Sequence, residues 1–353
     1  MRAVIAVPFG RVIGSFGSGT SPSLRLRHWE SALHYVTFQG VTTEDDDHSI
    51  PGTFSAPDAG EAVPDAVDTI RARTIGILAA AGIADPEVDA DLLIGHVLGR
   101  SRGEVQAAVI LRTGVTSADA AAIDVLVSRR ALREPLQHIT GRAPFRSIEL
   151  LVGPGVFVPR PETEQVAQFA IDALRSVPDP DPIGVDLGTG SGAIALSLAV
   201  EVPNARIWAV ENSPEAFAWT TRNFTAVNAA NATLVFGDLA DTGILAELDG
   251  TVAVVISNPP YIPADAVPRD PEVRLFDPAH ALFGGADGLD VVRHVSQTAL
   301  RLLRPGGVLV IEHGELQGGD IRALLAGDGW RATATHRDYT TRDRATTAIR
   351  PTP

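Results

Sequence analysis

The sequence Asn258-Pro259-Pro260-Tyr261 directly follows an apolar run, residues 252–256, that is typical of a buried central β-strand. Two consecutive prolines supply no backbone N–H, and Pro259 keeps Asn258 out of the helical region. The result is a rigid turn at the carboxyl end of a strand, with an amide side chain and free carbonyls. A planar NH2 group can donate one hydrogen to the side-chain oxygen of Asn258 and the other to a proline carbonyl. The turn therefore predicts a receptor for an amide or exocyclic amine, and chemistry on nitrogen.

A glycine-rich turn follows an earlier expected strand, residues 183–187, and begins a helix at about residue 193. Its sequence is Asp186-Leu187-Gly188-Thr189-Gly190-Ser191-Gly192. Glycines let the backbone approach a ligand closely, and a helix N-terminus directs its N–H groups at an anionic group. The turn lacks the G-x-G-x-x-G pattern of dinucleotide-binding proteins. Its G-x-G-x-G form after an acid suits S-adenosylmethionine, although a tight strand-to-helix turn is the structural alternative.

Acidic residues follow the next two expected strands. Glu211 ends the strand at 206–210, where an acid can accept both ribose hydroxyls of a nucleotide in bidentate fashion. Asp238, after the strand at 233–236, can accept the adenine amino group, and Leu239 can cover the ring. Alternatively, Glu211 caps the following helix and Asp238 belongs to a plain Gly-Asp turn. Three successive strand ends that carry glycines and acids make coincidence much less probable than each site does alone.

The Asn-Pro-Pro-Tyr turn (residues 258–261) ends the fourth expected strand, so it shares one edge of the sheet with the cofactor residues. A methyl group on a sulfonium needs a nucleophile aligned behind the S–CH3 bond and no metal. An amide nitrogen is a poor nucleophile, because its lone pair is delocalised into the carbonyl. If Asn258 and a proline carbonyl hold both N–H groups, the lone pair is oriented and developing positive charge is stabilised. Tyr261 can wall the pocket.

The surrounding sequence predicts an α/β fold in which a helical bundle precedes a mostly parallel sheet. Residues 1–66 are rich in Gly, Ser, Pro and acids, and we expect a disordered extension there. Residues 67–141 show helical spacing of apolar residues, with a helix start at Asp85-Pro86-Glu87 and helix ends at Gly82 and Gly99. Residues 142–182 are expected to hold a hairpin around residues 153–155 and a linker helix from Pro161. Strands and helices alternate over 183–353.

Composition narrows the functional classes. The chain has 353 residues, no cysteine and a net charge of −14. No apolar run is long enough to cross a bilayer, and we expect a cytoplasmic protein. The acidic balance disfavours stable binding of nucleic acid, and His138, His280, His294 and His313 lack metal-ligand spacing. The sequence thus predicts an enzyme without a metal site or a membrane partner.

From residue 67 onward the chain resembles the protein-glutamine N5-methyltransferases that modify class 1 peptide chain release factors. The segments that carry the resemblance are residues 159–164, 186–192, 257–261, 276–278, 282–289 and 311–314. The resemblance implies a seven-stranded Rossmann-like methyltransferase domain and a helical domain that docks the release factor. It also implies S-adenosylmethionine as the methyl donor and the glutamine of the Gly-Gly-Gln motif as the acceptor. One departure is Glu211, where an Asp is more usual.

By motif match, the resemblance assigns two groups of site residues. The cofactor would contact Gly188, Thr189, Gly190, Ser191, Gly192, Glu211, Asp238, Leu239 and Asn258, and the glutamine would contact Asn258, Pro259, Pro260 and Tyr261. Catalysis would rest on Asn258 and Tyr261. One alternative is a methyltransferase of exocyclic amines in adenine or guanine, which would need a basic groove and a means of extruding the base. A non-catalytic scaffold that binds S-adenosylmethionine is another, which the intact Asn-Pro-Pro-Tyr turn disfavours.

Overall fold

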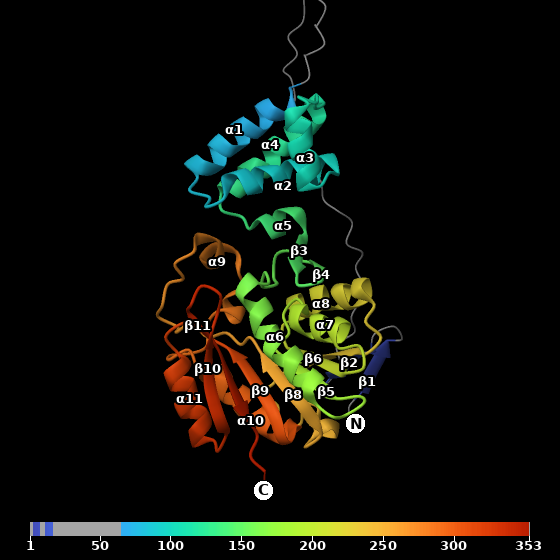
Figure 1. Ribbon diagram of the computed structural model, residues 1–353, viewed down its shortest axis with the longest axis vertical. Helices are drawn as coiled ribbons and strands as arrows, with labels where there is room; N and C mark the ends of the chain where they lie inside the picture. The colour runs from blue at the N-terminus through green and yellow to red at the C-terminus, as the bar shows by residue number, and fades with distance from the viewer. Residues whose placement is uncertain (1–2, 8–10, 17–64, 353) are drawn as a thin grey trace, which may run out of the picture.

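The computed structural model of the chain describes residues 3–7, 11–16 and 65–352. A helical domain lies at one end of the molecule and an α/β domain at the other (Figure 1). The helical domain contains α1 (Val67–Ala80), α2 (Pro86–Leu98), α3 (Arg102–Ile110), α4 (Ser117–Ala131) and α5 (Leu136–Thr140). Within the described ranges, no helix is both long and apolar enough for a membrane span.

Local sequence signals account for the ends of the helices in the helical domain. Pro86 occupies the first turn of α2, and Gly99 ends it in the left-handed conformation. Ser101 and Glu104 form a capping box at the start of α3, and the side chain of Thr116 caps α4. The helices enclose a separate apolar core, formed by residues such as Ile70, Leu78, Leu93, Ile94, Val105 and Ile123.

The α/β domain is built on a nine-stranded sheet with the order β1-β2-β7-β6-β5-β8-β9-β11-β10. Seven strands form the predicted methyltransferase sheet: β5 (Ile183–Leu187), β6 (Arg206–Glu211), β7 (Ala232–Phe236), β8 (Val252–Ser257), β9 (Leu303–Glu312), β10 (Arg331–Arg337) and β11 (Asp343–Ile349). Strands β5 to β9 run parallel, whereas β11 is antiparallel to β9 and β10. This arrangement confirms the predicted fold class.

Helices cover both faces of the sheet, so the central strands are buried on each side. The helices are α6 (Pro161–Ser176), α7 (Ala193–Glu201), α8 (Pro214–Val227), α10 (Asp290–Leu302) and α11 (Gly318–Gly327). Along β5, Val185 and Leu187 belong to the core that includes α10 and α11, while Gly184 faces Leu174 of α6. Because both faces are buried, the polar residues of these strands are confined to the strand ends.

The predicted hairpin is present, but its turn lies earlier than expected. Strands β3 (Arg142–Phe145) and β4 (Ile148–Leu151) are joined at Arg146 and Ser147 rather than around residues 153–155. Arg146 adopts a positive φ of 51°, which is costly for a residue with a side chain. Its guanidinium donates to Glu201 of α7, and its backbone N–H donates to Glu164 of α6. These contacts offset the strain, and the hairpin is thereby fixed to the α/β domain.

Two further strands, β1 (Ala3–Val7) and β2 (Arg11–Phe16), lie at the edge of the sheet, where β2 pairs in parallel with β7. They fall within the segment for which the sequence predicts a disordered extension, and over these residues the backbone differs from that expectation. The remainder of the predicted extension, up to residue 64, lies outside the described residues.

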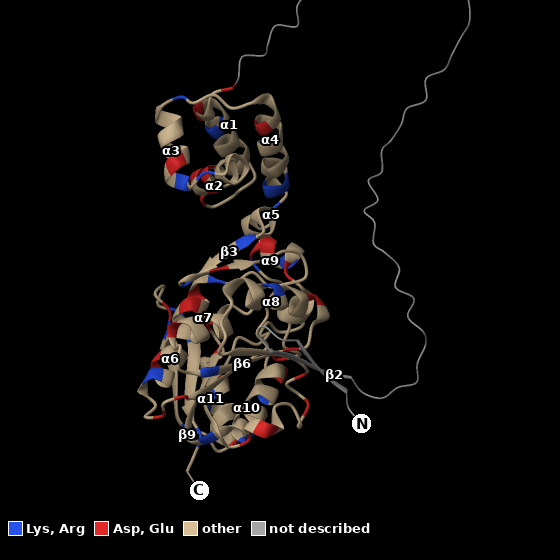
Figure 2. Ribbon diagram, turned by 90° about the vertical axis from the view of Figure 1, so that its right-hand side faces the viewer, with Lys and Arg blue, Asp and Glu red and all other residues tan. Residues whose placement is uncertain are grey.

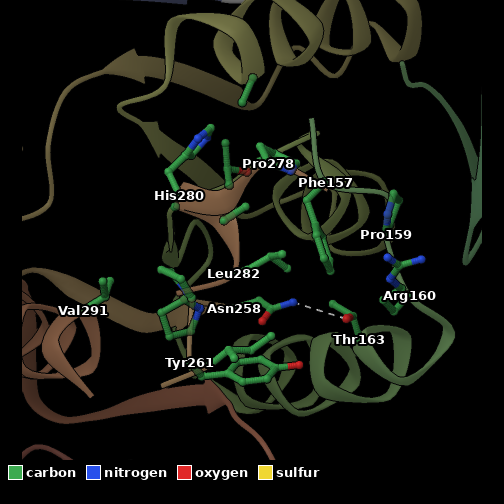
Figure 3. Close-up of a pocket in the computed structure, with 18 of the residues that line it drawn as sticks. Phe157, Pro159, Arg160, Thr163, Asn258, Tyr261, Pro278, His280, Leu282 and Val291 are labelled. Atoms are coloured by element: carbon green, nitrogen blue, oxygen red, sulfur yellow. Dashed lines mark hydrogen bonds between the residues drawn. The ribbon is translucent and has the colours of Figure 1, made fainter. Parts of the chain in front are cut away.

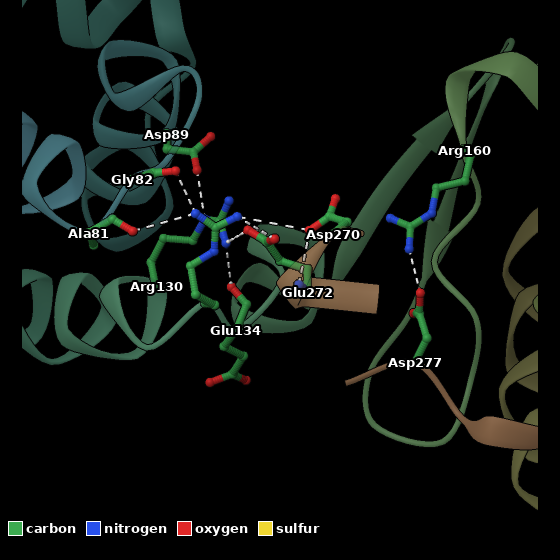
Figure 4. A network of polar contacts seen from close by, with 10 residues as sticks. Ala81, Gly82, Asp89, Arg130, Glu134, Arg160, Asp270, Glu272 and Asp277 are labelled. Carbon is green, nitrogen blue, oxygen red and sulfur yellow. Dashed lines mark hydrogen bonds and ion pairs between the residues drawn. The ribbon is translucent and has the colours of Figure 1, made fainter. Parts of the chain in front are cut away.

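Two arginines connect the helical domain to the loop over residues 262–289, which includes α9 (Pro271–Phe276) (Figure 4). Arg130 of α4 donates to Glu272 of α9 at 2.8 Å and to Asp89 of α2 at 2.7 Å. Arg133 donates to the other carboxylate oxygen of Glu272 at 2.6 Å. Burial acts to raise the pKa of Glu272, but hydrogen bonds from Arg130 and Arg133 lower this pKa to about 2. Glu272 therefore stays ionised between the two domains.

Replacing Glu272 with alanine is expected to lower the free energy of unfolding by about 3 kcal/mol, because two largely buried guanidinium groups each lose a charged acceptor, although Arg130 keeps Asp89. Since the folded-state pKa lies below the ordinary value of 4.5, this stabilisation is present above pH 4.5 and is lost as the pH falls toward 2. Urea unfolding at pH 7 measures the change. Glu149→Ala, which breaks an exposed pair with Arg142, is the control and should cost less than about 1 kcal/mol. Equal losses in the two variants would contradict this role.

Candidate active site

A cavity of about 790 Å³ opens at the carboxyl ends of the parallel strands, next to the first turn of α6 (Figure 3). Among its lining residues are all predicted site residues except Gly192, namely Gly188, Thr189, Gly190, Ser191, Glu211, Asp238, Leu239, Asn258, Pro259, Pro260 and Tyr261. The fold thus brings the ends of four strands, far apart in the sequence, to one cavity.

The glycine turn (residues 186–192) presents its backbone to this cavity. Gly188 and Gly190 have φ values of +73° and +58°, and a Cβ atom on either would meet no atom of the described residues within 4 Å. Their missing side chains therefore leave open space beside the cavity, where a ligand can approach the backbone. Gly192 differs, because a Cβ there would lie 3.1 Å from Thr220. Gly192 allows close packing of α7 against α8 and does not line the cavity.

Asp186 supports the glycine turn from inside the protein. Its Oδ2 accepts hydrogen bonds from the Thr189 hydroxyl at 2.6 Å and from the Ala195 N–H at 3.2 Å. Complete burial raises the pKa of Asp186 to about 7, and these two bonds oppose the rise. Asp186 does not line the cavity. Its side chain shapes the turn that does.

Glu211 lies at the end of β6, and its carboxylate is largely occupied by backbone groups. Oε1 accepts from the N–H groups of Asn212 at 3.1 Å and Ser213 at 2.8 Å, and Oε2 accepts from Gly190 at 2.8 Å. Burial raises the pKa of Glu211, and these bonds oppose the rise. A carboxylate has about four lone-pair sites, so Oε2 retains one and Oε1 none. This arrangement differs from the expected bidentate site, since only Oε2 can take a hydroxyl group.

The turn after β7 adds a wall to the same cavity. Asp238 accepts a hydrogen bond from the Ala240 N–H at 2.8 Å through Oδ1, which forms a tight turn. The Leu239 carbonyl accepts from the Thr298 hydroxyl of α10 at 2.8 Å, which fixes the leucine beside the cavity. The carboxylate of Asp238 and the apolar side chain of Leu239 thus lie side by side at the cavity. This combination suits a flat ring that has a polar edge.

The Asn-Pro-Pro-Tyr turn is fixed from both sides. The Asn258 NH2 group points to the Thr163 hydroxyl of α6, 3.5 Å away (Figure 3). Beyond the turn, the Ile262 N–H donates to the Leu282 carbonyl at 2.8 Å. A Cβ on Gly284 would lie only 2.4 Å from the Pro260 carbonyl oxygen, so that carbonyl faces the 262–289 loop. Of the two proline carbonyls, Pro259 is therefore the one left to accept from a ligand.

Tyr261 forms a wall of the cavity rather than a base. Burial, followed by the nearby Glu312 carboxylate, raises the pKa of its phenol to about 12. The phenol therefore remains neutral at physiological pH. Its backbone carbonyl accepts from the Gln317 side chain at 2.9 Å, which ties the turn to the segment before α11.

Several lining residues were not singled out from the sequence as site residues: Phe157, Arg160, Thr163, His280 and Leu282 (Figure 3). The guanidinium of Arg160 lies 4.9 Å from the centre of the Phe157 ring and donates to Asp277 at 2.5 Å. Residues 159–164 are one of the segments that carry the family resemblance, and this is the sequence signal for Arg160 and Thr163. Phe157 and Leu282 carried none, because an isolated apolar residue is equally compatible with the core.

Comparison with known proteins agrees with this geometry. Residues 69–141 match a family model described as the PrmC N-terminal domain, and residues 147–292 match one described as a methyltransferase small domain. The chain is 48% identical over 279 residues to the release factor glutamine methyltransferase of Streptomyces coelicolor, covering 78% of this chain and 95% of that protein.

Two further relatives carry the same name. The protein of Bifidobacterium longum is 45% identical over 277 residues, which cover 76% of this chain and 94% of that protein. The protein of Deinococcus radiodurans is 41% identical over 277 residues, with 77% and 94% covered. Matches at this level span both domains and nearly the full length of each relative. The chain therefore belongs to the release factor glutamine methyltransferase family.

Proposed function

We propose that this chain transfers a methyl group from S-adenosylmethionine to the side-chain amide nitrogen, N5, of a glutamine. The acceptor is the glutamine in the Gly-Gly-Gln motif of class 1 peptide chain release factors. The observation that carries the proposal is a single cavity lined by both the glycine turn and the Asn-Pro-Pro-Tyr turn. The names of the relatives supply the substrate class.

The residues present fit S-adenosylmethionine on three observations. The open space beside Gly188 and Gly190 leaves room for a ligand against the backbone, and α7 begins at this point. Glu211 has one lone pair left for a ribose hydroxyl, and Asp238 with Leu239 suits an adenine ring. When bound, this cofactor supplies a methyl group on a positively charged sulfur. The chain contributes the orientation of the acceptor.

The Asn-Pro-Pro-Tyr turn would orient the glutamine amide. Asn258 Oδ1 and the Pro259 carbonyl each accept one hydrogen of the NH2 group, so the nitrogen lone pair is directed at the methyl carbon. As the N–C bond forms and the S–CH3 bond breaks, positive charge would pass from the sulfur to the nitrogen, and both acceptors would bind the NH2 group more strongly. The amide proton becomes acidic only then, and it is lost to water. A strong general base is not needed before attack.

A nucleobase amine offers the same two hydrogens, but the charge of the chain disfavours nucleic acid. The net charge is −14. Figure 2 shows acidic and basic residues interspersed over the helices and strands of both domains. A protein acceptor is therefore the better fit, and the helical domain is the part of the chain that we propose docks it. The cytoplasmic location stays a prediction.

The two acceptor classes are separated by a competition experiment. The purified chain is incubated with S-adenosylmethionine labelled in its methyl group, an unmethylated class 1 release factor and total nucleic acid in one reaction. Label is expected in the release factor alone. Label in the nucleic acid alone would overturn the proposal in favour of an amino methyltransferase of nucleobases.

A further inference from the structure

A buried carboxyl group lies behind Asn258 and has no role in the proposed function as stated. Glu312 ends β9 and is 1% exposed. Strands β8 and β9 pair in parallel up to Ser257 and Ile311, so Asn258 and Glu312 are neighbours one step beyond the last pair. Among the residues that the structure describes, none forms a hydrogen bond with the Oε2 atom of Glu312. A buried carboxyl oxygen that receives no hydrogen bond is unusual, and this one lies beside the Asn258 amide that is proposed to bind the substrate.

Thr163 completes a small polar cluster with these two residues. It lies in the first turn of α6 and is 3% exposed. Its hydroxyl oxygen is 3.5 Å from the Asn258 nitrogen, and both Thr163 and Asn258 act to lower the pKa of the neighbouring Glu312 carboxyl group. The three side chains come from α6, the end of β8 and the end of β9. They meet in the cavity wall, where Thr163 and Asn258 line the cavity and Glu312 lies behind them.

The cluster bears on the orientation of the Asn258 amide. An asparagine side chain has one end that donates and one that accepts, and only the oxygen can receive the NH2 group of a substrate. A rotated amide would present its own NH2 group to the substrate and repel it. The turn itself does not select one orientation, because its prolines restrain only the backbone. Acceptors on the protein side, at Thr163 and Glu312, are what can hold the NH2 end away from the cavity.

We infer that Glu312 is a positioning residue that, together with Thr163, holds the NH2 end of Asn258 so that Oδ1 faces the substrate amide. The inference rests on the proposed function and assigns the residue that sets the geometry of its acceptor site. Glu312 touches neither substrate nor cofactor, since it does not line the cavity. It acts through Asn258.

The ionisation of Glu312 makes this role measurable. Burial raises its pKa to about 7, against the effects of the Thr163 hydrogen bond and of Arg344. The charged or titratable groups that face it are Glu162 from α6, Tyr261 after β8 and Arg344 from β11. The adjacent His313 ring bonds to the Gly314 carbonyl and to Thr346 instead. A protonated Glu312 becomes a hydrogen-bond donor and competes for the Asn258 oxygen, so the substrate site loses its acceptor as the pH falls below about 7.

The first test is nuclear magnetic resonance of the ¹⁵N-labelled full chain. The side-chain NH2 signals of Asn258 are assigned by their loss in Asn258→Asp. They are expected to shift through a transition near pH 7 in the wild-type protein and to lose that transition in Glu312→Gln. Asn258 signals that titrate identically in both proteins, or that do not respond to pH in either, would overturn the inference.

The second test is methyl transfer to the release factor as a function of pH. Glu312→Gln and Thr163→Val should each lower kcat by on the order of 10- to 100-fold at pH 8, with KM for S-adenosylmethionine unchanged. Thr163→Ser should retain the wild-type rate. Thr346→Val removes a buried hydroxyl that contacts His313 and not Asn258, and it is the matched control. The fall in the wild-type rate below about pH 7 should be absent in Glu312→Gln.

The two proposals fail in different ways. An active Glu312→Gln variant with the wild-type kcat and the same fall in rate below about pH 7 would overturn the role of Glu312 and leave the proposed function intact. A wild-type protein that transfers no methyl group to the release factor would overturn the proposed function. In that case the resonance titration still decides whether Glu312 sets the orientation of the Asn258 amide.

Discussion

Replacing Asn258 with alanine is expected to lower kcat by on the order of 10²- to 10³-fold, while the dissociation constant of S-adenosylmethionine stays nearly unchanged. The variant removes one of two acceptors that orient the amide lone pair and bind the charge developing on nitrogen, and losses of this size are typical for preorganised polar groups. The cofactor retains the glycine turn, Glu211 and the Asp238 turn. Steady-state kinetics and isothermal titration calorimetry measure the two quantities separately.

The control for this variant is Asn204→Ala. Asn204 is exposed and donates only to the Pro180 carbonyl at 2.9 Å, at the opposite ends of the strands. It should leave both kcat and cofactor affinity at wild-type values. An equal loss of turnover and cofactor binding in Asn258→Ala would instead assign Asn258 to the cofactor.

Replacing Gly190 with valine is expected to weaken S-adenosylmethionine binding by on the order of 100-fold or more. At φ +58° the new side chain would project into the open space beside the cavity, where it occludes the ligand. The substitution also strains the backbone, because a left-handed residue with a side chain costs about 1–2 kcal/mol. Calorimetric titration with S-adenosylmethionine measures the affinity, and urea unfolding measures the strain.

Gly250→Val separates the two effects of that substitution. Gly250 has a φ of +70°, and a Cβ there would also meet no atom within 4 Å, but it lies outside the cavity. It should lose as much stability as Gly190→Val and keep the wild-type cofactor affinity. A comparable loss of affinity in both variants would show that strain, rather than occlusion, weakens binding.

Regular patterns in the sequence predicted the α/β domain and the edge of its sheet at which a ligand binds. Apolar runs such as residues 252–256 are typical of the central strands of a covered sheet, and the carboxyl ends of parallel strands share an edge. Gly190, Glu211 and Asn258 are therefore brought together by topology alone. Helix starts were equally predictable, because proline at the first turn and serine or threonine caps act locally.

Features that depend on distant contacts were not predictable in this way. The hairpin turns at Arg146 because Glu164 and Glu201, far along the chain, stabilise a conformation that arginine disfavours. Helix α9 has only six residues, and Glu272 in it is fixed by arginines of the helical domain. The position of Glu312 behind Asn258 was not predictable either, since nothing in the sequence of a strand end reveals which side chain will lie behind it.

The position of the transferred methyl group distinguishes the proposed reaction from its alternatives most directly. A class 1 release factor is incubated with the wild-type chain and S-adenosylmethionine, digested, and mapped by tandem mass spectrometry. A single methyl group is predicted on the side-chain nitrogen of the glutamine in the Gly-Gly-Gln peptide. It should be lost when that glutamine is replaced by glutamate. A methyl group on any other residue, or an unmodified peptide beside an active cofactor-turnover signal, would contradict the assignment.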